Sequence, residues 1–342
     1  PDRQDPFTTD SDGRPFDKPL DIALGFISKF SDKPFFLNFA PFYVHGPIQT
    51  RDRARMELYC KKMGYDFPSD PGAINQGKAG HSNPYYASMV DTVDWMIGQV
   101  VNLLEATDDP RNPGHKLIEN TYVIIDSDNG GWIGSSAEPI TDNSPLYGGK
   151  MTTFEGGIRI PFIVRGPGVE PGSVCRTPIN LIDLFPTFMH MAGLVPAKEL
   201  QLDGCNILPL IQGKSETARL ADGSIRESIF WYYPIESHMS AVVRKGDWKL
   251  LRNYGIGMQT REGVQLFRLV NEDGSPADPG EKTDLSEKYP EIRDALLAEL
   301  DAHLADAGAA MPTRNLNSAS DAEKAASPGV LKTGSQRDTA WA

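Results

Sequence analysis

Residues 121–131 read TYVIIDSDNGG, and the fold prediction starts from this stretch. Residues 122–125 are apolar and mostly β-branched, which is typical of a buried strand in a parallel sheet. The strand leads into Asp126, Asp128 and Asn129, and ligands of open α/β sheets bind beyond the carboxyl ends of strands. Carboxylate and amide oxygens suit Ca²⁺ or Mg²⁺, so the stretch predicts a metal-binding turn. The alternative is an Asx-rich turn without a ligand.

Strand and helix patterns alternate on both sides of this stretch. A polar segment at residues 49–82 indicates an inserted loop with some helix. Asn83 and Pro84 are suited to the N-cap and first turn of a long amphipathic helix. The order of elements predicts an α/β fold with a parallel sheet and covering helices. The other predicted elements are helices at residues 21–30 and 181–192, strands at 34–40 and 158–165, and a loop at 108–114.

The pattern changes after about Gly213. Short strands are predicted at residues 228–232, 241–243, 248–251 and 264–269, followed by an amphipathic helix with Ile292, Leu296, Leu300 and Leu304. They predict a small antiparallel sheet with one packed helix. From Gly308 onward few large apolar residues occur, which indicates an extended surface tail. The predicted parts are therefore residues 1–213, 214–307 and 308–342.

Composition narrows the classes of function. The 342 residues carry a formal net charge of −12, which argues against non-specific binding of nucleic acid. No apolar run approaches the ~20 residues that cross a bilayer. Cys60, Cys175 and Cys205 form no CxxC pair, which argues against zinc or thioredoxin-like chemistry. One disulfide with a free thiol and three buried thiols both remain open.

Two further polar segments are candidates for chemistry. Lys150 lies between Gly149 and Met151 in a glycine-rich stretch that also holds Glu155 and Arg159. Glycines permit tight turns that can press a lysine against an anion, although a loop with solvated charges is the alternative. His45 follows the predicted strand at residues 34–40 and either contacts an anion or lies at the surface.

These segments belong to a larger series of blocks. In chain order the series is PFFLNFAPFYVHGP, YYASMVDTVDWMIGQVVNLLE, NTYVIIDSDNGG, PLYGGKMTTFEGGIRIPFIVRGPG, LIDLFPTFMHMAGL, RKGDWKLL, QLFRLVNEDG and PGEKTDL. The series resembles the type I sulfatases of the alkaline-phosphatase superfamily over residues 21–304, with the carbohydrate sulfatases nearest in pattern. The resemblance implies an alkaline-phosphatase-like α/β fold, with a mixed, mostly parallel sheet sandwiched by helices. It also implies that residues 1–213 form the C-terminal part of the catalytic domain and residues 214–307 the C-terminal subdomain.

The resemblance also implies roles for individual residues. Asp128 and Asn129 match the calcium-ligating Asp–Asn of the family. Lys150 matches the lysine that contacts the sulfate and helps to stabilise the leaving oxygen. His45 matches the sulfate-contacting histidine of the H-x-P turn. Trp132 stands near a position where many relatives have a histidine or a similar polar residue, and we expect this difference to concern the substrate.

Other substrate contacts are predicted on weaker grounds. Relatives often show a Tyr–Pro–His cluster, whereas here Tyr233 and Pro234 precede Ile235, and His238 follows. Tyr232, Tyr233 and His238 are therefore candidates for holding the sugar, with packing at a domain seam as the alternative. Arg159 is a further candidate for contact with the substrate.

The nucleophile of the family is absent from this sequence. It is a formylglycine made from Cys or Ser in a C/S-x-P-x-R motif, and no such motif occurs here. Asp128 and Asn129 also supply too few oxygens for Ca²⁺, which takes about 6–8. We expect an N-terminal part of the same sulfatase to provide the missing groups. The alternative is a truncated product that cannot catalyse.

The expected activity is hydrolysis of a sulfate ester on a sulfated sugar or polysaccharide fragment. A phosphodiesterase or phosphonate hydrolase of the same superfamily is one alternative, and a non-catalytic binding protein on a sulfatase scaffold is another. The first alternative would use more metal-ligating His and Asp residues. The usual export of the family implies a periplasmic or secreted protein, although residues 1–10 show no signal-peptide pattern.

Overall fold

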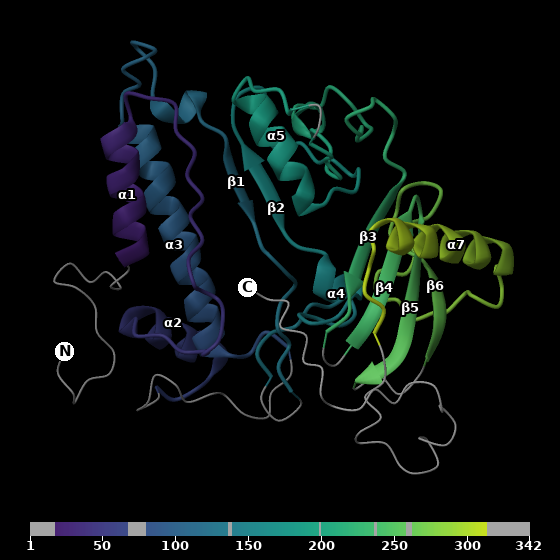
Figure 1. Ribbon diagram of the computed structural model, residues 1–342. Coiled ribbons are helices and arrows are strands. Elements are labelled where there is room, and N and C mark those ends of the chain that lie inside the picture. The colour runs from purple at the N-terminus through teal and green to yellow at the C-terminus, as the bar shows by residue number, and fades with distance from the viewer. Residues whose placement is uncertain are drawn as a thin grey trace, which may run out of the picture. The chain divides into compact units, whose positions relative to one another are not determined.

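The computed structural model describes residues 18–67, 80–135, 139–197, 200–235, 238–257 and 262–312. The chain divides into two compact units (Figure 1). The first unit comprises Pro1–Ile229 and Pro276–Lys282, and the second comprises Phe230–Ser275 and Thr283–Ala342. Most of the predicted tail, residues 313–342, lies outside the described residues.

Three helices form one side of the first unit. They are α1 (Lys18–Phe30), α2 (Arg53–Met63) and α3 (Pro84–Ala106), and α1 lies beside α3 in Figure 1. Ile27 of α1 and Leu104 of α3 meet Leu117 of a 3-10 helix (Leu117–Asn120) in one core cluster. These helices confirm the prediction at residues 21–30, the long helix after Asn83 and the helix within residues 49–82, of which 68–79 lie outside the described residues.

Asn83 fixes the start of α3. Its side-chain oxygen accepts a hydrogen bond from the Tyr86 backbone N–H at 3.1 Å, which satisfies a donor that the helix leaves open. We expect Asn83→Ala to cost about 1 kcal/mol and to lower the melting temperature by about 2–4 °C. Thermal unfolding is the measurement, and Asn83→Ser is the control because it retains an oxygen acceptor. Equal losses in both variants would contradict the capping role.

The strand before the predicted metal turn has an antiparallel neighbour. β1 (Val123–Asp126) pairs with β2 (Phe162–Arg165), with Val123 opposite Arg165 and Asp126 opposite Phe162 (Figure 1). The expected parallel neighbours of β1 are not found in the described residues. Parallel strands require a long crossover connection, usually a helix. Between β1 and β2 the described chain forms only the four-residue helix α4 (Glu155–Ile158), and it therefore returns in the opposite direction.

One predicted strand is absent from the described residues, and another begins later than predicted. Residues 34–40 are not assigned to a strand, because none of the described strands pairs with them, although Phe35 and Leu37 pack against the core of α1 and α3. The strand predicted from residue 158 begins only at Phe162. Ile158 ends α4, and Pro161 has no N–H to donate to a ladder.

The rest of the first unit contains short helices. A 3-10 turn (Leu181–Asp183) leads into α5 (Leu184–Met191), which confirms the helix predicted at residues 181–192, and α6 (Leu208–Ile211) follows. Cys60 and Cys205 are buried free thiols, whereas Cys175 is free and exposed. No described helix is both long and apolar enough to cross a membrane.

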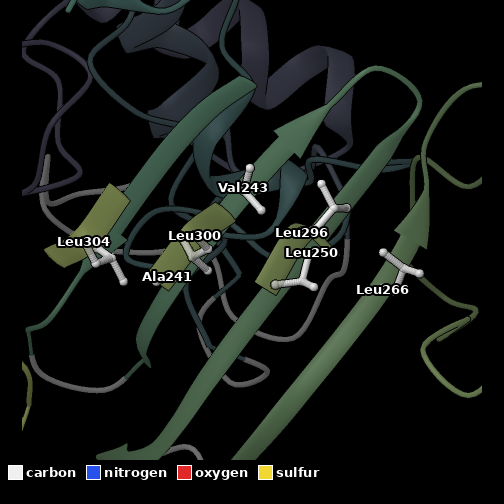
Figure 2. Packing of buried hydrophobic residues seen from close by; sticks show 7 residues of the cluster. All are labelled: Ala241, Val243, Leu250, Leu266, Leu296, Leu300 and Leu304. Atoms are coloured by element: carbon white, nitrogen blue, oxygen red, sulfur yellow. The ribbon is translucent and has the colours of Figure 1, made fainter. Parts of the chain in front are cut away.

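The second unit is a sheet covered on one face by a helix. The sheet has the order β3 (Ser228–Tyr233), β4 (His238–Lys245), β5 (Trp248–Gly257) and β6 (Glu262–Arg268), with β4–β5 and β5–β6 antiparallel. Helix α7 (Pro290–Asp306) carries Leu296, Leu300 and Leu304, spaced by four residues. Figure 2 shows these side chains in one cluster with sheet residues, which are Ala241, Val243, Leu250 and Leu266. The antiparallel sheet and its helix are as predicted.

Candidate active site

The turn after β1 presents oxygen atoms to the surface. Ser127 Oγ donates to the Asn129 carbonyl at 2.9 Å, and Asn129 Nδ2 donates to the Gly130 carbonyl at 2.9 Å. Since the amide nitrogen of Asn129 is engaged within the turn, its Oδ1 remains available as an acceptor. Burial raises the pKa of Asp126, and the negative charge of Asp128 adds to the rise. The turn therefore concentrates negative charge and hard oxygen groups.

The Lys150 loop is bonded directly to this turn. The Lys150 backbone N–H donates to the Gly131 carbonyl at 3.1 Å, and the Gly130 N–H donates to the Gly157 carbonyl at 2.8 Å. An alanine Cβ at Gly130 would stand 1.8 Å from the Gly156 carbonyl oxygen, so only glycine allows this approach of two backbones. The sequence predicted both segments separately, and the structure places them together.

Asn143 joins three glycine segments of this region. Its Nδ2 lies 2.9 Å from the Gly131 carbonyl oxygen, 3.1 Å from that of Gly148 and 3.2 Å from that of Gly156. The side chain thus holds the Asp128 turn and the Lys150 loop against each other. Asn143 was not among the predicted site residues. Its only local signal is the Asn-x-Pro pattern with Pro145, which is typical of a turn.

The Lys150 side chain remains available to an anion. The residue is half-buried, and within the described part of the chain its ammonium group has no ion-pair partner. A lysine on a loop that is bonded to an acidic turn is suited to an anion that bridges the lysine and a cation.

His45 occupies a turn that reaches the same region. Its backbone N–H donates to the Phe42 carbonyl at 2.9 Å, and its Nδ1 lies 2.9 Å from the Gly46 carbonyl oxygen. A carbonyl oxygen only accepts, so Nδ1 carries the hydrogen and Nε2 is the atom available to a ligand. The Trp132 ring lies 4.0 Å from the Cβ position of Gly46, which brings the His45 turn beside the segment that follows Asp128 and Asn129.

Arg159, Tyr232, Tyr233 and His238 are the remaining predicted contacts. Arg159 is exposed, and its backbone N–H donates to the Glu155 carbonyl at 2.8 Å at the end of α4. In the second unit the Tyr232 hydroxyl donates to the Ala310 carbonyl, and its ring lies 6.3 Å from that of Tyr254. His238 begins β4 opposite Gly257, and its side chain lies outside the described residues. Tyr233 lies half-buried at the end of β3.

The acidic turn does not form a complete metal site by itself. Within the described part of the chain, no group of three or more His, Cys, Asp or Glu side chains is arranged to hold a metal ion. Asp128 and Asn129 offer oxygen donors of the type that Ca²⁺ prefers, but they are fewer than the ion needs.

Comparison with known proteins assigns the family. A family model described as Sulfatase matches residues 2–194. The chain belongs to the sulfatase family. This assignment confirms the resemblance seen in the sequence blocks, and it places the Asp128 turn, the Lys150 loop and the His45 turn within the matched part of a sulfatase.

Curated relatives extend the similarity to most of the chain. A sulfatase of Formosa agariphila is 32% identical over 289 residues, which cover 79% of this chain and 45% of that protein. The human N-acetylgalactosamine-6-sulfatase is 30% identical over 298 residues, which cover 81% of this chain and 49% of that protein. This sulfatase chain therefore spans about half the length of the curated relatives it matches.

Solved structures confirm the fold of the sulfatase chain. The crystal structure of Ps i-CgsB matches with a TM-score of 0.63 and 27% identity, covering 83% of this chain and 53% of that one. A structure from work on the metabolism of multiple glycosaminoglycans by Bacteroides thetaiotaomicron matches with a TM-score of 0.61 and 25% identity. It covers 83% of this chain and 53% of the other. The predicted alkaline-phosphatase-like fold class is thereby confirmed.

Proposed function

We propose that the complete polypeptide carrying this chain hydrolyses sulfate esters and releases inorganic sulfate. The observation that carries the proposal is the backbone bond between Lys150 and Gly131, which fixes a cationic loop beside the Asp128–Asn129 turn. Membership of the sulfatase family supports the choice of sulfate among tetrahedral anions. An anion held between a lysine and a divalent cation is the arrangement that this chemistry requires.

The donor set of the turn fits Ca²⁺, with Mg²⁺ as the alternative. Asp128 would contribute a carboxylate and Asn129 its Oδ1, since Asn129 Nδ2 is engaged with the Gly130 carbonyl. When bound, the ion supplies positive charge to the sulfate oxygens and acts as a Lewis acid. The remaining ligands and the formylglycine nucleophile would come from an N-terminal part of the same sulfatase, because no C/S-x-P-x-R motif occurs in this sequence.

Lys150 and His45 would act on the sulfate itself. The Lys150 ammonium would offset charge on the sulfate and on the ester oxygen as the S–O bond breaks. His45 Nδ1 is engaged with Gly46, so the ring would address the anion through Nε2, which donates when the imidazole is cationic. Both groups bind and orient the anion as well as stabilise the charge that develops during the reaction.

A sulfated sugar or polysaccharide fragment is the proposed substrate. One relative is a human N-acetylgalactosamine-6-sulfatase, and one similar structure comes from work on glycosaminoglycan metabolism. Trp132, Arg159, Tyr232, Tyr233 and His238 stay predicted contacts to the sugar. A periplasmic or secreted location is proposed with this substrate, since such polymers lie outside the cell.

We expect Lys150→Ala in the complete protein to lower kcat for sulfate release by about 10²–10³, the usual cost of removing one group that stabilises transition-state charge. Sulfate released from an aryl sulfate and from a sulfated sugar is quantified by ion chromatography. The control is Lys116→Ala, because Lys116 is exposed and its Nζ pairs with Asp108 at 2.6 Å. Unchanged turnover in Lys150→Ala would refute the proposed role. Turnover of aryl phosphodiesters or phosphonates without sulfate release would refute the sulfatase activity.

A further inference from the structure

Two exposed aromatic side chains lie against the His45–Gly46 turn. The Phe42 side chain belongs to a residue that is 66% exposed, and its ring centroid lies 5.2 Å from that of His45. Trp132 is 46% exposed, and its ring lies 4.0 Å from the point where a Cβ would stand at Gly46. Phe42 thus lies beside the histidine that is proposed to contact the sulfate, and Trp132 lies beside the glycine that follows this histidine.

The neighbouring core explains how this turn is held. Tyr43 and Val44, which separate Phe42 from His45, pack against a buried cluster that includes Met56 and Met89. Phe42 and Trp132 belong to none of the buried clusters of the described chain. The core therefore anchors the middle of the segment, while the residues on either side of this anchor remain at the surface. Single exposed apolar residues are common, but two large exposed rings beside the adjacent residues His45 and Gly46 indicate a binding surface.

The positive charge of the neighbouring Lys150 loop indicates which class of ligand suits this surface. A half-buried lysine, Lys150, lies on the loop bonded to Gly131, and Trp132 is the next residue after Gly131. A ligand suited to this surface combines an anionic group with an apolar ring face. A sulfated pyranose has both, because its axial C–H bonds form an apolar face that packs on aromatic rings.

We propose that Phe42 and Trp132 bind the pyranose ring of the substrate and thereby select sulfated sugars over sulfate esters without a ring. This inference rests on the proposed sulfatase function and assigns a role to Phe42, which was not among the predicted site residues. The rings hold the sugar, whereas Lys150 and His45 hold the sulfate group. Both aromatic residues are specificity-determining and are not required for cleavage of the S–O bond.

The test uses Phe42→Leu and Trp132→Leu in the complete protein. N-acetylgalactosamine 6-sulfate is the ring-bearing substrate, and a short alkyl sulfate is the substrate without a ring. We expect each variant to raise KM for the sugar about five- to tenfold, the range expected when an aromatic contact is lost. The kcat for the sugar should change far less than KM, and the change in KM for the alkyl sulfate should be less than that for the sugar. Phe42→Tyr and Trp132→Phe should restore most of the sugar affinity.

The matched control is Phe36→Leu, which makes the same change at a residue that is 65% exposed. The Phe36 ring lies 5.1 Å from that of Phe188 in α5 and not against the His45 turn, so its KM should stay at the wild-type value. Equal increases in KM for both substrates, or unchanged KM values in both leucine variants, would overturn the aromatic role while leaving the sulfatase function intact. A wild-type protein that releases no sulfate from either substrate would refute the function and the inference together.

Discussion

Gly130→Ala is expected to destabilise the first unit by more than about 3 kcal/mol and to lower its melting temperature by more than about 6 °C. The added Cβ would lie 1.8 Å from the Gly156 carbonyl oxygen and 2.8 Å from its carbonyl carbon. Both are backbone atoms, so no side chain can rotate away. Separating the segments would break the 2.8 Å hydrogen bond from the Gly130 N–H to the Gly157 carbonyl. Differential scanning calorimetry of the complete protein measures the effect.

The matched control is the same substitution in a helix. Gly98 lies within α3, and apart from its chain neighbours and the backbone of the helix itself no heavy atom of the described residues lies within 4 Å of its Cβ position. Gly98→Ala should therefore stabilise the helix by up to about 1 kcal/mol, because alanine has the higher helix propensity. Sulfate release should fall in Gly130→Ala and stay unchanged in Gly98→Ala, since Gly130 bonds the Asp128 turn to the Lys150 loop whereas Gly98 lies in α3. A Gly130→Ala protein that melts at the wild-type temperature would contradict the close backbone packing.

The fold was predictable where its signals are local. The N-cap at Asn83 and the leucines spaced by four residues in α7 both lie within one element, and both predictions were confirmed. Strand pairing depends on partners distant in sequence. The apolar residues 34–40 therefore looked like a strand although no described strand pairs with them, and β1 met an antiparallel neighbour.

In the candidate site too, features with a local signal were predictable, whereas contacts between distant segments were not. Glycines beside Asp128 and Lys150 indicated close approach of the backbone, and the structure brings these two segments together. The carbonyls that Asn143 binds come from three separate segments, so no local pattern could identify its role. The approach of the Trp132 ring to Gly46 joins residues far apart in sequence, so no local pattern could predict it either.

Asp183→Ala is expected to cost about 3–5 kcal/mol, the usual penalty for leaving one member of a buried ion pair uncompensated. Asp183 is fully buried and the Arg226 side chain is only 7% exposed. Arg226 bonds both carboxylate oxygens, with Nη2 donating to Oδ2 at 2.9 Å. The same carboxylate accepts the Cys205 N–H at 2.8 Å and thereby joins the start of α5 to the segment before α6. Thermal unfolding of the complete protein is the measurement.

Two further variants test whether the stability lost in Asp183→Ala comes from the uncompensated buried charge of Arg226. One removes a surface ion pair, and the other removes both buried charges. Arg165 Nη1 lies 2.7 Å from Glu105 Oε1, but the two side chains are 54% and 45% exposed, so Glu105→Ala should cost at most about 1 kcal/mol. Asp183→Leu combined with Arg226→Met removes both charges and should recover part of the stability lost in Asp183→Ala. Recovery should be incomplete because the backbone N–H groups of Asn180 and Cys205 lose their acceptor. If Asp183→Ala costs no more than Glu105→Ala, the buried pair does not hold these segments together.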